Sequence, residues 1–300
     1  MSLTPHTLAE LQESLQNAST PVGPINLSAF NTVKEHIPED MTATVECGMT
    51  LAAFQSQIGK HGQWLPVDPP GAEQLSISDL LMWNHSGPRR LGFGTIRDWL
   101  IGIRYVSTNG ELVFNGGKVV KNVAGFDLCK LLVGSQGTLG VAVEATFKLA
   151  PIPECEQFCE LACDSLAHAK RLMRSLRESK LHFSVLDLVG KPDTNPLIIT
   201  GFSGAQADVA AQTTQLQLLS ESTKSALAHD QWRLNNEHHV ASVPPASLIN
   251  LIQDKAADEF VARAGNGVVY LPGPTPARTP SNLEQRVKAL FDPKEILPPL

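Results

Sequence analysis

The chain has 300 residues, of which 30 are acidic and 24 are basic, so its formal net charge is −6. Hydrophobic residues make up 42% and charged residues 18%, proportions typical of a soluble globular protein with one large domain or two ordinary ones. The mild acidic balance argues against a general nucleic-acid-binding protein, which needs a basic face. No apolar run approaches the roughly 20 residues of a membrane span, and the polar N-terminus lacks the apolar core of a signal peptide.

The cysteines are few and odd in number, which does not indicate a disulfide framework. We therefore expect reduced thiols and a cytoplasmic protein. Cys155, Cys159 and Cys163 would share one face of a strand, but the closely spaced pairs of zinc and iron–sulfur sites are missing. We interpret them as core residues and His238-His239 as part of a solvated loop, and we predict no metal site.

The N-terminal part of the chain predicts a helix, a strand and a second helix. Leucines at helical spacing predict the first helix over residues 3–18. Hydrophobic and polar residues alternate over 41–47, which indicates a half-buried strand. Thr50 is placed to cap a helix that runs through Ile58. Residues 65–98 are rich in Pro, Gly, Ser and Asn, and a loop of this length in a compact domain is usually functional.

A hairpin is predicted next. Alternating residues over 101–105 form its first strand and 111–114 its second. Asn109-Gly110 between them suits a type I′ turn. Residues 126–133 are expected to form a short helix or a turn.

The segment Gly134 to Gly140 is rich in glycine and precedes an alternating strand over 141–147. A Rossmann phosphate loop instead opens a helix, and its glycines are spaced differently. The sequence thus excludes a nicotinamide Rossmann site. It leaves two interpretations of the loop: a phosphate cradle, or a tight turn before a core strand.

After the prolines at 151 and 153 the pattern changes. The predicted elements are a strand at 155–163, an amphipathic helix at 165–180, a strand at 197–202, helices at 205–220 and 246–263, a strand at 268–271 and a last helix at 281–290. This order indicates a small second α+β domain.

The segment Asn84 to Arg90 carries the residues best suited to ligand binding. Gly87 allows close backbone approach, Ser86 offers hydrogen bonds, and two adjacent arginines suit a phosphate or a carboxylate. A solvated basic turn is the alternative. The nearby Gly92, Gly94 and Asp98 favour a ligand loop. No arrangement of nucleophile and histidine stands out, so no catalytic residue is predicted.

Residues 40–154 resemble the FAD-binding subunits of bacterial glycolate oxidases, which are flavoproteins with a vanillyl-alcohol-oxidase or PCMH-type FAD domain. The most specific motifs are Ser86-Gly87-Pro88-Arg89-Arg90, Lys121 to Asp127 and Gly134 to Gly140. The C-terminal ARAGNGVVYLPGP and LEQRVKALFDP are similar to the closing segments of that family. Residues 155–260 match only in pattern.

The resemblance implies an α+β fold with an N-terminally truncated PCMH-type FAD-binding domain at 1–154, an α+β cap domain at 155–262 and a C-terminal segment, 263–300, that returns to the first domain. It implies oxidation of a small 2-hydroxy acid such as glycolate by hydride transfer to FAD. Electrons would leave through partners, a second flavoprotein subunit and an iron–sulfur subunit. The protein would be cytoplasmic, or peripheral to the inner membrane through those partners.

The resemblance also implies which residues contact FAD. These residues are Pro70, Gly71, Ser78, Asn84, Ser86, Gly87, Arg90, Gly94, Asp98, Gly137, Gly140 and Val141.

Two departures from the family bear on the cofactor. The glycine-rich loop that donates N–H groups to the FAD diphosphate is missing, and Pro21 to Pro24 cannot replace it because proline has no N–H. Ser78-Asp79 stands where the family has two glycines, and a carboxylate repels a diphosphate unless Arg89 or Arg90 offsets it. Two hypotheses stay open: an FAD-linked oxidoreductase subunit, and a flavin-free structural or assembly subunit.

Overall fold

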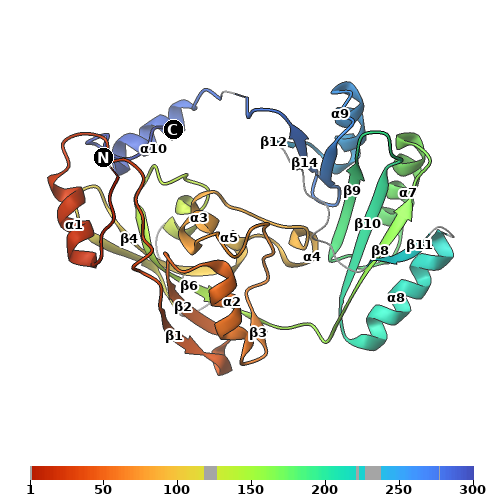
Figure 1. The fold of residues 1–300 in the computed structure, drawn as a ribbon, viewed down its shortest axis with the longest axis horizontal. Coiled ribbons are helices and arrows are strands. Elements are labelled where there is room, and N and C mark those ends of the chain that lie inside the picture. The colour runs from red at the N-terminus through yellow and green to blue at the C-terminus, as the bar shows by residue number, and fades with distance from the viewer. Residues whose placement is uncertain (1, 118–126, 221–222, 227–237, 277) are drawn as a thin grey trace. The chain divides into compact units, whose positions relative to one another are not determined.

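The computed structural model describes residues 2–117, 127–220, 223–226, 238–276 and 278–300 (Figure 1). The chain forms two compact units. The first unit contains residues 1–86, 95–152 and 279–300, and the second contains 87–94 and 153–278. Each unit combines a sheet with helices, so the predicted α+β fold is confirmed.

The first unit is built on a five-stranded antiparallel sheet with strand order β1-β2-β6-β4-β5. Its strands are β1 (Val33–Ile37), β2 (Thr42–Glu46), β4 (Leu100–Val106), β5 (Leu112–Gly116) and β6 (Val141–Lys148). A two-stranded ribbon joins β3 (Gln63–Trp64) to β7 (Ala150–Pro151), and the 3-10 turn η1 (Pro38–Asp40) links β1 to β2.

Four helices share the main hydrophobic core with this sheet. They are α2 (Leu51–Gly59), α3 (Ile77–Met82), α5 (Ile96–Trp99) and α6 (Leu128–Leu132). Phe54 of α2 lies 6.0 Å from Phe147 of β6 between ring centroids. The Thr50 hydroxyl accepts the N–H of Ala53, as expected for the cap of α2.

A second core joins the two ends of the chain. Leu11 and Leu15 of α1 (Leu8–Asn17) pack with Val143, and Ile296 and Leu297 complete the cluster. The segment from α10 (Asn282–Phe291) to the C-terminus thereby belongs to the first unit.

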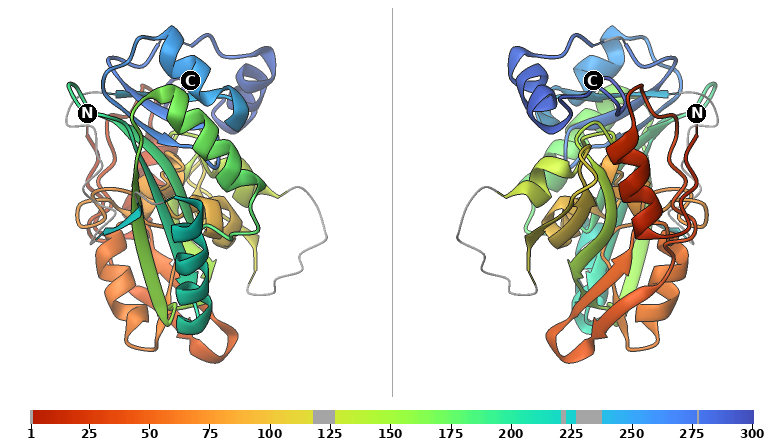
Figure 2. Two further views of the ribbon diagram at one scale, coloured as in Figure 1. Left: turned by 90° about the vertical axis from the view of Figure 1, so that its right-hand side faces the viewer. Right: turned by 90° about the vertical axis from the view of Figure 1, so that its left-hand side faces the viewer.

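The second unit contains a seven-stranded antiparallel sheet with strand order β11-β8-β10-β9-β13-β14-β12. Its strands are β8 (Cys155–Ala162), β9 (Val185–Gly190), β10 (Leu197–Gly204), β11 (Thr223–Ala226), β12 (His238–Ser242), β13 (Phe260–Arg263) and β14 (Val268–Pro272). Its helices are α4 (Arg90–Phe93), α7 (Leu166–Glu178), α8 (Gln206–Leu219), the 3-10 turn η2 (Pro245–Ser247) and α9 (Leu248–Asp254). Figure 2 (left) shows α7 and α8 in front of the strands, and their buried residues share a core with the sheet.

Two helix predictions were too long. The first helix begins only after Thr7, whose hydroxyl accepts the N–H of Glu10, and Leu3 instead forms a parallel bridge with Ile25. The helix predicted over 246–263 ends at Asp254. Ala256 has a left-handed φ of 47°, which stops the helix before β13 begins.

Three further predictions were wrong in detail. The hairpin does not have a type I′ turn, because Gly110 but not Asn109 has a positive φ; the turn over Ser107 to Gly110 ends in that left-handed glycine. His238 and His239 begin the edge strand β12 rather than a loop. The chain rejoins the first unit at residue 279 rather than 263, since β13 and β14 pair within the second sheet.

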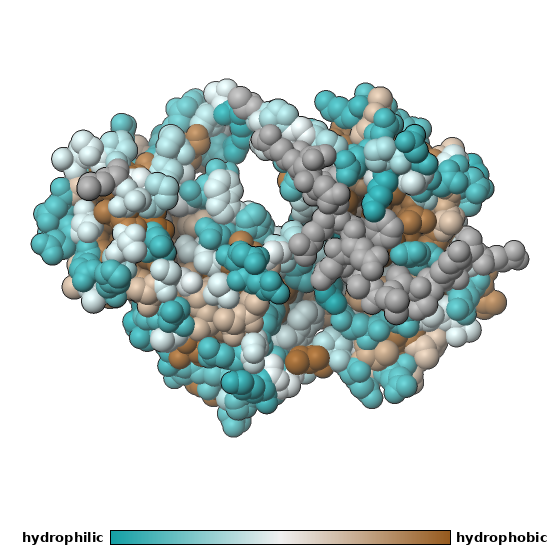
Figure 3. Space-filling view, in the orientation of Figure 1, coloured by the Kyte–Doolittle hydropathy of each residue, from teal (hydrophilic) through white to brown (hydrophobic). Residues whose placement is uncertain are grey.

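Two features of the described residues concern their hydropathy, one at the surface and one in the helices. In the view of Figure 3 the surface is largely hydrophilic, with hydrophobic residues scattered over it. Among the described residues, no helix combines the length and hydropathy that crossing a bilayer requires.

The second sheet contains a buried ion pair. Asp187 of β9 and Arg263 of β13 are 2% and 7% exposed, and the guanidinium also lies 5.5 Å from the centre of the Tyr270 ring. Removing one member of such a pair leaves the other charge buried without its counter-charge.

We predict that Asp187→Ala lowers the free energy of unfolding by about 3–5 kcal/mol, because the Arg263 charge stays buried. Lys34→Ala is the control, since the pair that Lys34 forms with Glu46 is half exposed on its lysine side and is worth about 1 kcal/mol or less. Urea denaturation measures both. Equal losses in the two variants would contradict the structural importance of the buried pair.

Candidate functional site

The start of α3 is capped by its own side chains. Ser76 is the N-cap residue, and its hydroxyl accepts the N–H of Asp79 at 3.0 Å. The same hydroxyl donates to the Asp79 carboxylate at 2.6 Å. A serine followed three residues later by an acidic residue is a common signal for a helix start. Asp79 therefore has a structural role at the start of α3.

The N–H groups of the first turn of α3 all have partners inside the protein. The N–H groups of Ile77, Ser78, Asp79 and Leu80 donate to the Met49 carbonyl, the Cys47 carbonyl, the Ser76 hydroxyl and the Ser76 carbonyl, at distances between 2.7 and 3.0 Å. A helix start binds an anion through N–H groups that are still unpaired. The start of α3 has none of its first four to offer, and Asp79 adds a negative charge there.

The end of α3 holds the glycine loop, residues 134–140. The Gly134 N–H donates to the Leu81 carbonyl at 2.9 Å, and the Gln136 N–H donates to the Met82 carbonyl at 2.8 Å. The Ser135 hydroxyl lies 3.4 Å from the Met82 sulfur. These bonds place the loop beside the Asn84 region, although the two segments lie some 50 residues apart in the sequence. Two of the segments predicted to bind a ligand are therefore neighbours.

The predicted glycines fall into two groups. Gly71 and Gly137 have φ values of 76° and 75°, and a Cβ atom added to either would meet nothing within 4 Å. Gly140 differs, because a Cβ atom there would lie 2.6 Å from the buried Tyr105 ring. Val141 is buried in the core that contains α1. The backbone is thus open at Gly71 and Gly137, whereas packing explains Gly140 and Val141.

The Ser-Gly-Pro-Arg-Arg motif divides between the units. Ser86 is a buried residue of the first unit, and the segment from Gly87 to Gly94 belongs to the second. The Arg89 guanidinium donates to both carboxylate oxygens of Glu156, at 2.9 and 2.8 Å, and lies 5.4 Å from the centre of the Phe158 ring. Arg89 therefore anchors this segment to the second sheet.

The remaining predicted residues have local backbone roles. The Asp98 carboxylate accepts the N–H and the hydroxyl of Thr95, at 2.8 and 3.0 Å, and so caps α5. Gly94 ends α4 with a φ of 81°. Arg90 is the first residue of α4, and Pro70 is exposed.

Cys47, Cys129, Cys159 and Cys163 are buried, and Cys155 is partly buried. Cys159 and Cys163 are each 1% exposed. Burial raises the pKa of Cys129 to about 11 and that of Cys163 to about 11. A thiol with so high a pKa stays protonated at neutral pH and is a poor nucleophile. These side chains are suited to packing rather than to covalent chemistry.

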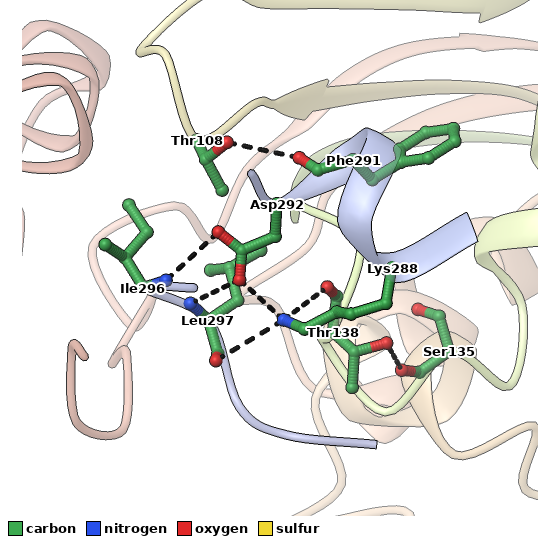
Figure 4. A network of polar contacts seen from close by, with 8 residues as sticks. All are labelled: Thr108, Ser135, Thr138, Lys288, Phe291, Asp292, Ile296 and Leu297. Atoms are coloured by element: carbon green, nitrogen blue, oxygen red, sulfur yellow. Dashed lines mark hydrogen bonds and ion pairs between the residues drawn. The ribbon is translucent and has the colours of Figure 1, made fainter. Parts of the chain in front are cut away.

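One residue of the candidate site was not predicted from the sequence. Lys288 of α10 donates to the Thr138 carbonyl of the glycine loop at 3.0 Å and to the Asp292 carboxylate at 2.5 Å (Figure 4). The spacing of four residues between a lysine and an aspartate was visible in the sequence. Its contact with a loop 150 residues away was not.

These residues fit FAD at one part of the site and not at another. The open backbone at Gly71 and Gly137 allows a flat cofactor to approach closely. The start of α3 does not fit a diphosphate, because its donors are used and Asp79 is negative. FAD would therefore be held through the glycine loop and the open backbone rather than by the first turn of α3.

Comparison with solved structures shows the fold. Alkyldihydroxyacetonephosphate synthase superposes with a TM-score of 0.73 and 19% sequence identity, covering 98% of this chain and 75% of that one. The likeness extends over both units. At this identity it carries no information on the reaction.

Sequence comparison finds relatives for part of the chain. Residues 5–115 match the model of the FAD binding domain. Glycolate oxidase subunit GlcD of Bacillus subtilis is 33% identical over 163 residues, which are 54% of this chain and 35% of that protein. Glycolate oxidase subunit GlcE of Escherichia coli is 37% identical over 130 residues, which are 43% of this chain and 37% of that protein. The chain thus spans little more than a third of either relative. Residues 5–115 are similar to the FAD binding domain, and the chain is similar in part of its sequence to glycolate oxidase subunits.

Proposed function

We propose that this chain is an FAD-linked oxidoreductase subunit that oxidises a small 2-hydroxy acid, glycolate being the first candidate. The match of residues 5–115 to the FAD binding domain supports the cofactor. Relatives named as glycolate oxidase subunits, D-2-hydroxyglutarate dehydrogenase and D-lactate dehydrogenase support the substrate class. FAD, when bound, supplies the acceptor for a hydride from the hydroxyl-bearing carbon.

One observation carries the proposal. The glycine loop lies against the end of α3, so two segments predicted to bind the cofactor meet at one place in the first unit. In this account, the backbone of Gly137 and of Gly71 contacts the cofactor, and α10 holds the loop from its other side. Because the start of α3 gives the diphosphate no donors, FAD affinity is modest.

The subunit is proposed to work in a complex. The relatives GlcD and GlcE are named as subunits of glycolate oxidase. We propose that the partners are a second flavoprotein subunit and an iron–sulfur subunit, which take the electrons onward. The complex would be cytoplasmic, or held at the inner membrane through its partners.

A second candidate is a flavin-free structural or assembly subunit derived from the same family. The start of α3 favours it, since its N–H groups are paired and Asp79 repels a diphosphate. The family match and the open glycine backbone favour the first candidate. The spectrum of the purified chain separates the two.

We predict that the chain, mixed with FAD and passed through a desalting column, retains flavin bands near about 370 and 450 nm. Anaerobic addition of glycolate, D-lactate and D-2-hydroxyglutarate in turn should bleach the 450-nm band with at least one of them. A chain that remains colourless with excess FAD would contradict the proposal and support the flavin-free subunit. Bound flavin that no 2-hydroxy acid reduces would contradict the substrate class.

Asp79→Asn should strengthen FAD binding by about fivefold, because removing one like charge near the diphosphate is worth about 1 kcal/mol in a solvent-exposed site. Asparagine keeps an oxygen that can accept the Ser76 hydroxyl. The change in flavin fluorescence on binding measures the affinity. Asp164→Asn, which removes an exposed carboxylate from the second unit, is the control. If FAD affinity does not rise in Asp79→Asn, or rises equally in Asp164→Asn, the diphosphate does not lie near Asp79.

Gly137→Ala and Gly140→Ala should mainly change different properties, FAD affinity in the first variant and stability in the second. Alanine at 140 meets the Tyr105 ring, and overpacking of this kind destabilises a fold by about 1–3 kcal/mol. Alanine at 137 costs about 1 kcal/mol through its left-handed backbone, but its methyl group would occupy the space where the cofactor approaches. Thermal denaturation and FAD titration together test this. Unchanged FAD affinity in Gly137→Ala would remove Gly137 from the site.

A further inference from the structure

Lys288, in the C-terminal segment, has a largely buried side chain that contacts two parts of the chain. The Lys288 side chain is 13% exposed, and its ammonium donates to the Asp292 carboxylate at 2.5 Å and to the Leu297 carbonyl at 3.4 Å. Its remaining contact, 3.0 Å long, is with the Thr138 carbonyl (Figure 4). The ammonium thus donates hydrogen bonds to acceptors in the C-terminal segment and in the glycine loop.

Asp292 fixes the place of that lysine. Its side chain is fully buried, and its oxygens accept the N–H groups of Ile296 and Leu297 at 3.0 and 2.9 Å. A buried carboxylate with this many donors cannot move without breaking several bonds at once. Lys288 is consequently held in one position, and the position is the one that reaches Thr138.

The contact at Thr138 continues through the loop. The Thr138 hydroxyl donates to the Ser135 carbonyl at 2.7 Å, and the Ser135 hydroxyl reaches the Met82 sulfur of α3. A chain of polar contacts therefore runs from α10 through the glycine loop to the end of α3. Gly137 lies between Ser135 and Thr138 and is open on its free side.

We propose that Lys288 is a positioning residue for the cofactor site: it holds the glycine loop in the conformation that presents Gly137 to FAD, without touching FAD itself. The inference rests on the proposed binding of FAD at this loop. When Thr138 loses its hydrogen bond to Lys288, the neighbouring Gly137 can adopt more backbone conformations. The affinity for FAD then falls in proportion to the fraction of chains whose loop is in the binding-competent conformation.

A second lysine of the same segment, which is exposed, provides a comparison. The Lys294 ammonium also donates to two backbone carbonyls, those of Gln16 and Thr108, at 3.0 and 3.2 Å. Both lysines therefore attach the C-terminal segment to the rest of the first unit. Lys288 contacts the glycine loop, whereas Lys294 donates to carbonyls of α1 and of the turn after β4.

The test compares FAD affinity and loop exchange in the full-length chain. Lys288→Met leaves Asp292 buried without its cation, so Lys288→Met is combined with Asp292→Asn, which removes both charges and keeps one oxygen that can accept one of the two N–H groups. We expect the double variant to bind FAD about tenfold more weakly than wild type, as when the competent fraction of the loop falls to about a tenth. The FAD affinity of Lys294→Met should stay within about twofold of wild type. Lys288→Arg alone, which keeps a cation with several donors, should retain most of the wild-type affinity.

Hydrogen exchange without FAD supplies a readout that does not depend on the cofactor. Amide exchange in a peptide covering residues 134–140 should be faster in the double variant and unchanged in Lys294→Met. Equal FAD affinity and equal loop exchange in the double variant and in Lys294→Met would overturn the proposal. A wild-type chain that binds no FAD would instead contradict the proposed function, and the wild-type titration alone reveals that outcome.

Discussion

The start of α3 constrains how this chain can hold a dinucleotide cofactor. A helix start is a ready site for phosphate only while its first N–H groups are unpaired. Here those groups bond to the carbonyls of Met49 and Cys47 and to Ser76. Asp79 then places a carboxylate where an anion would lie. In our proposal, FAD binding therefore depends on other parts of the chain.

Those parts form one continuous structure. The glycine loop is bonded to the end of α3 on one side and to Lys288 of α10 on the other. Segments from three distant regions of the sequence therefore meet where the backbone of Gly137 is open. The C-terminal segment, which joins α1 in the second hydrophobic core, therefore contacts the candidate site as well as contributing to the fold.

Periodicity predicted the elements that have one buried face. The strand over 41–47 and the helix over 165–180 carry clear patterns, and the structure confirms them as β2 and α7. The residues Phe260 to Arg263 are buried throughout, so no alternation shows, and they were assigned to a helix. Ala256, which ends that helix in a left-handed conformation, carries no sequence signal for it.

The site was predictable in its segments and not in its contacts. The glycines at 134–140 and the Asn84 to Arg90 motif predicted two ligand loops, and the structure places the glycine loop beside Asn84. The partner of Arg89 lies 67 residues away at Glu156, and that of Lys288 lies 150 residues away at Thr138. Such pairings depend on how strands and loops come together, and spacing along the chain does not encode them.

The most direct test of the account is a crystal structure of the chain bound to FAD. We expect the cofactor against the backbone of Gly137, with no hydrogen bond from the N–H groups of Ile77 to Leu80 to its diphosphate, and with the Ser76–Asp79 cap intact. A diphosphate seated on the first turn of α3, with that cap opened, would contradict the account.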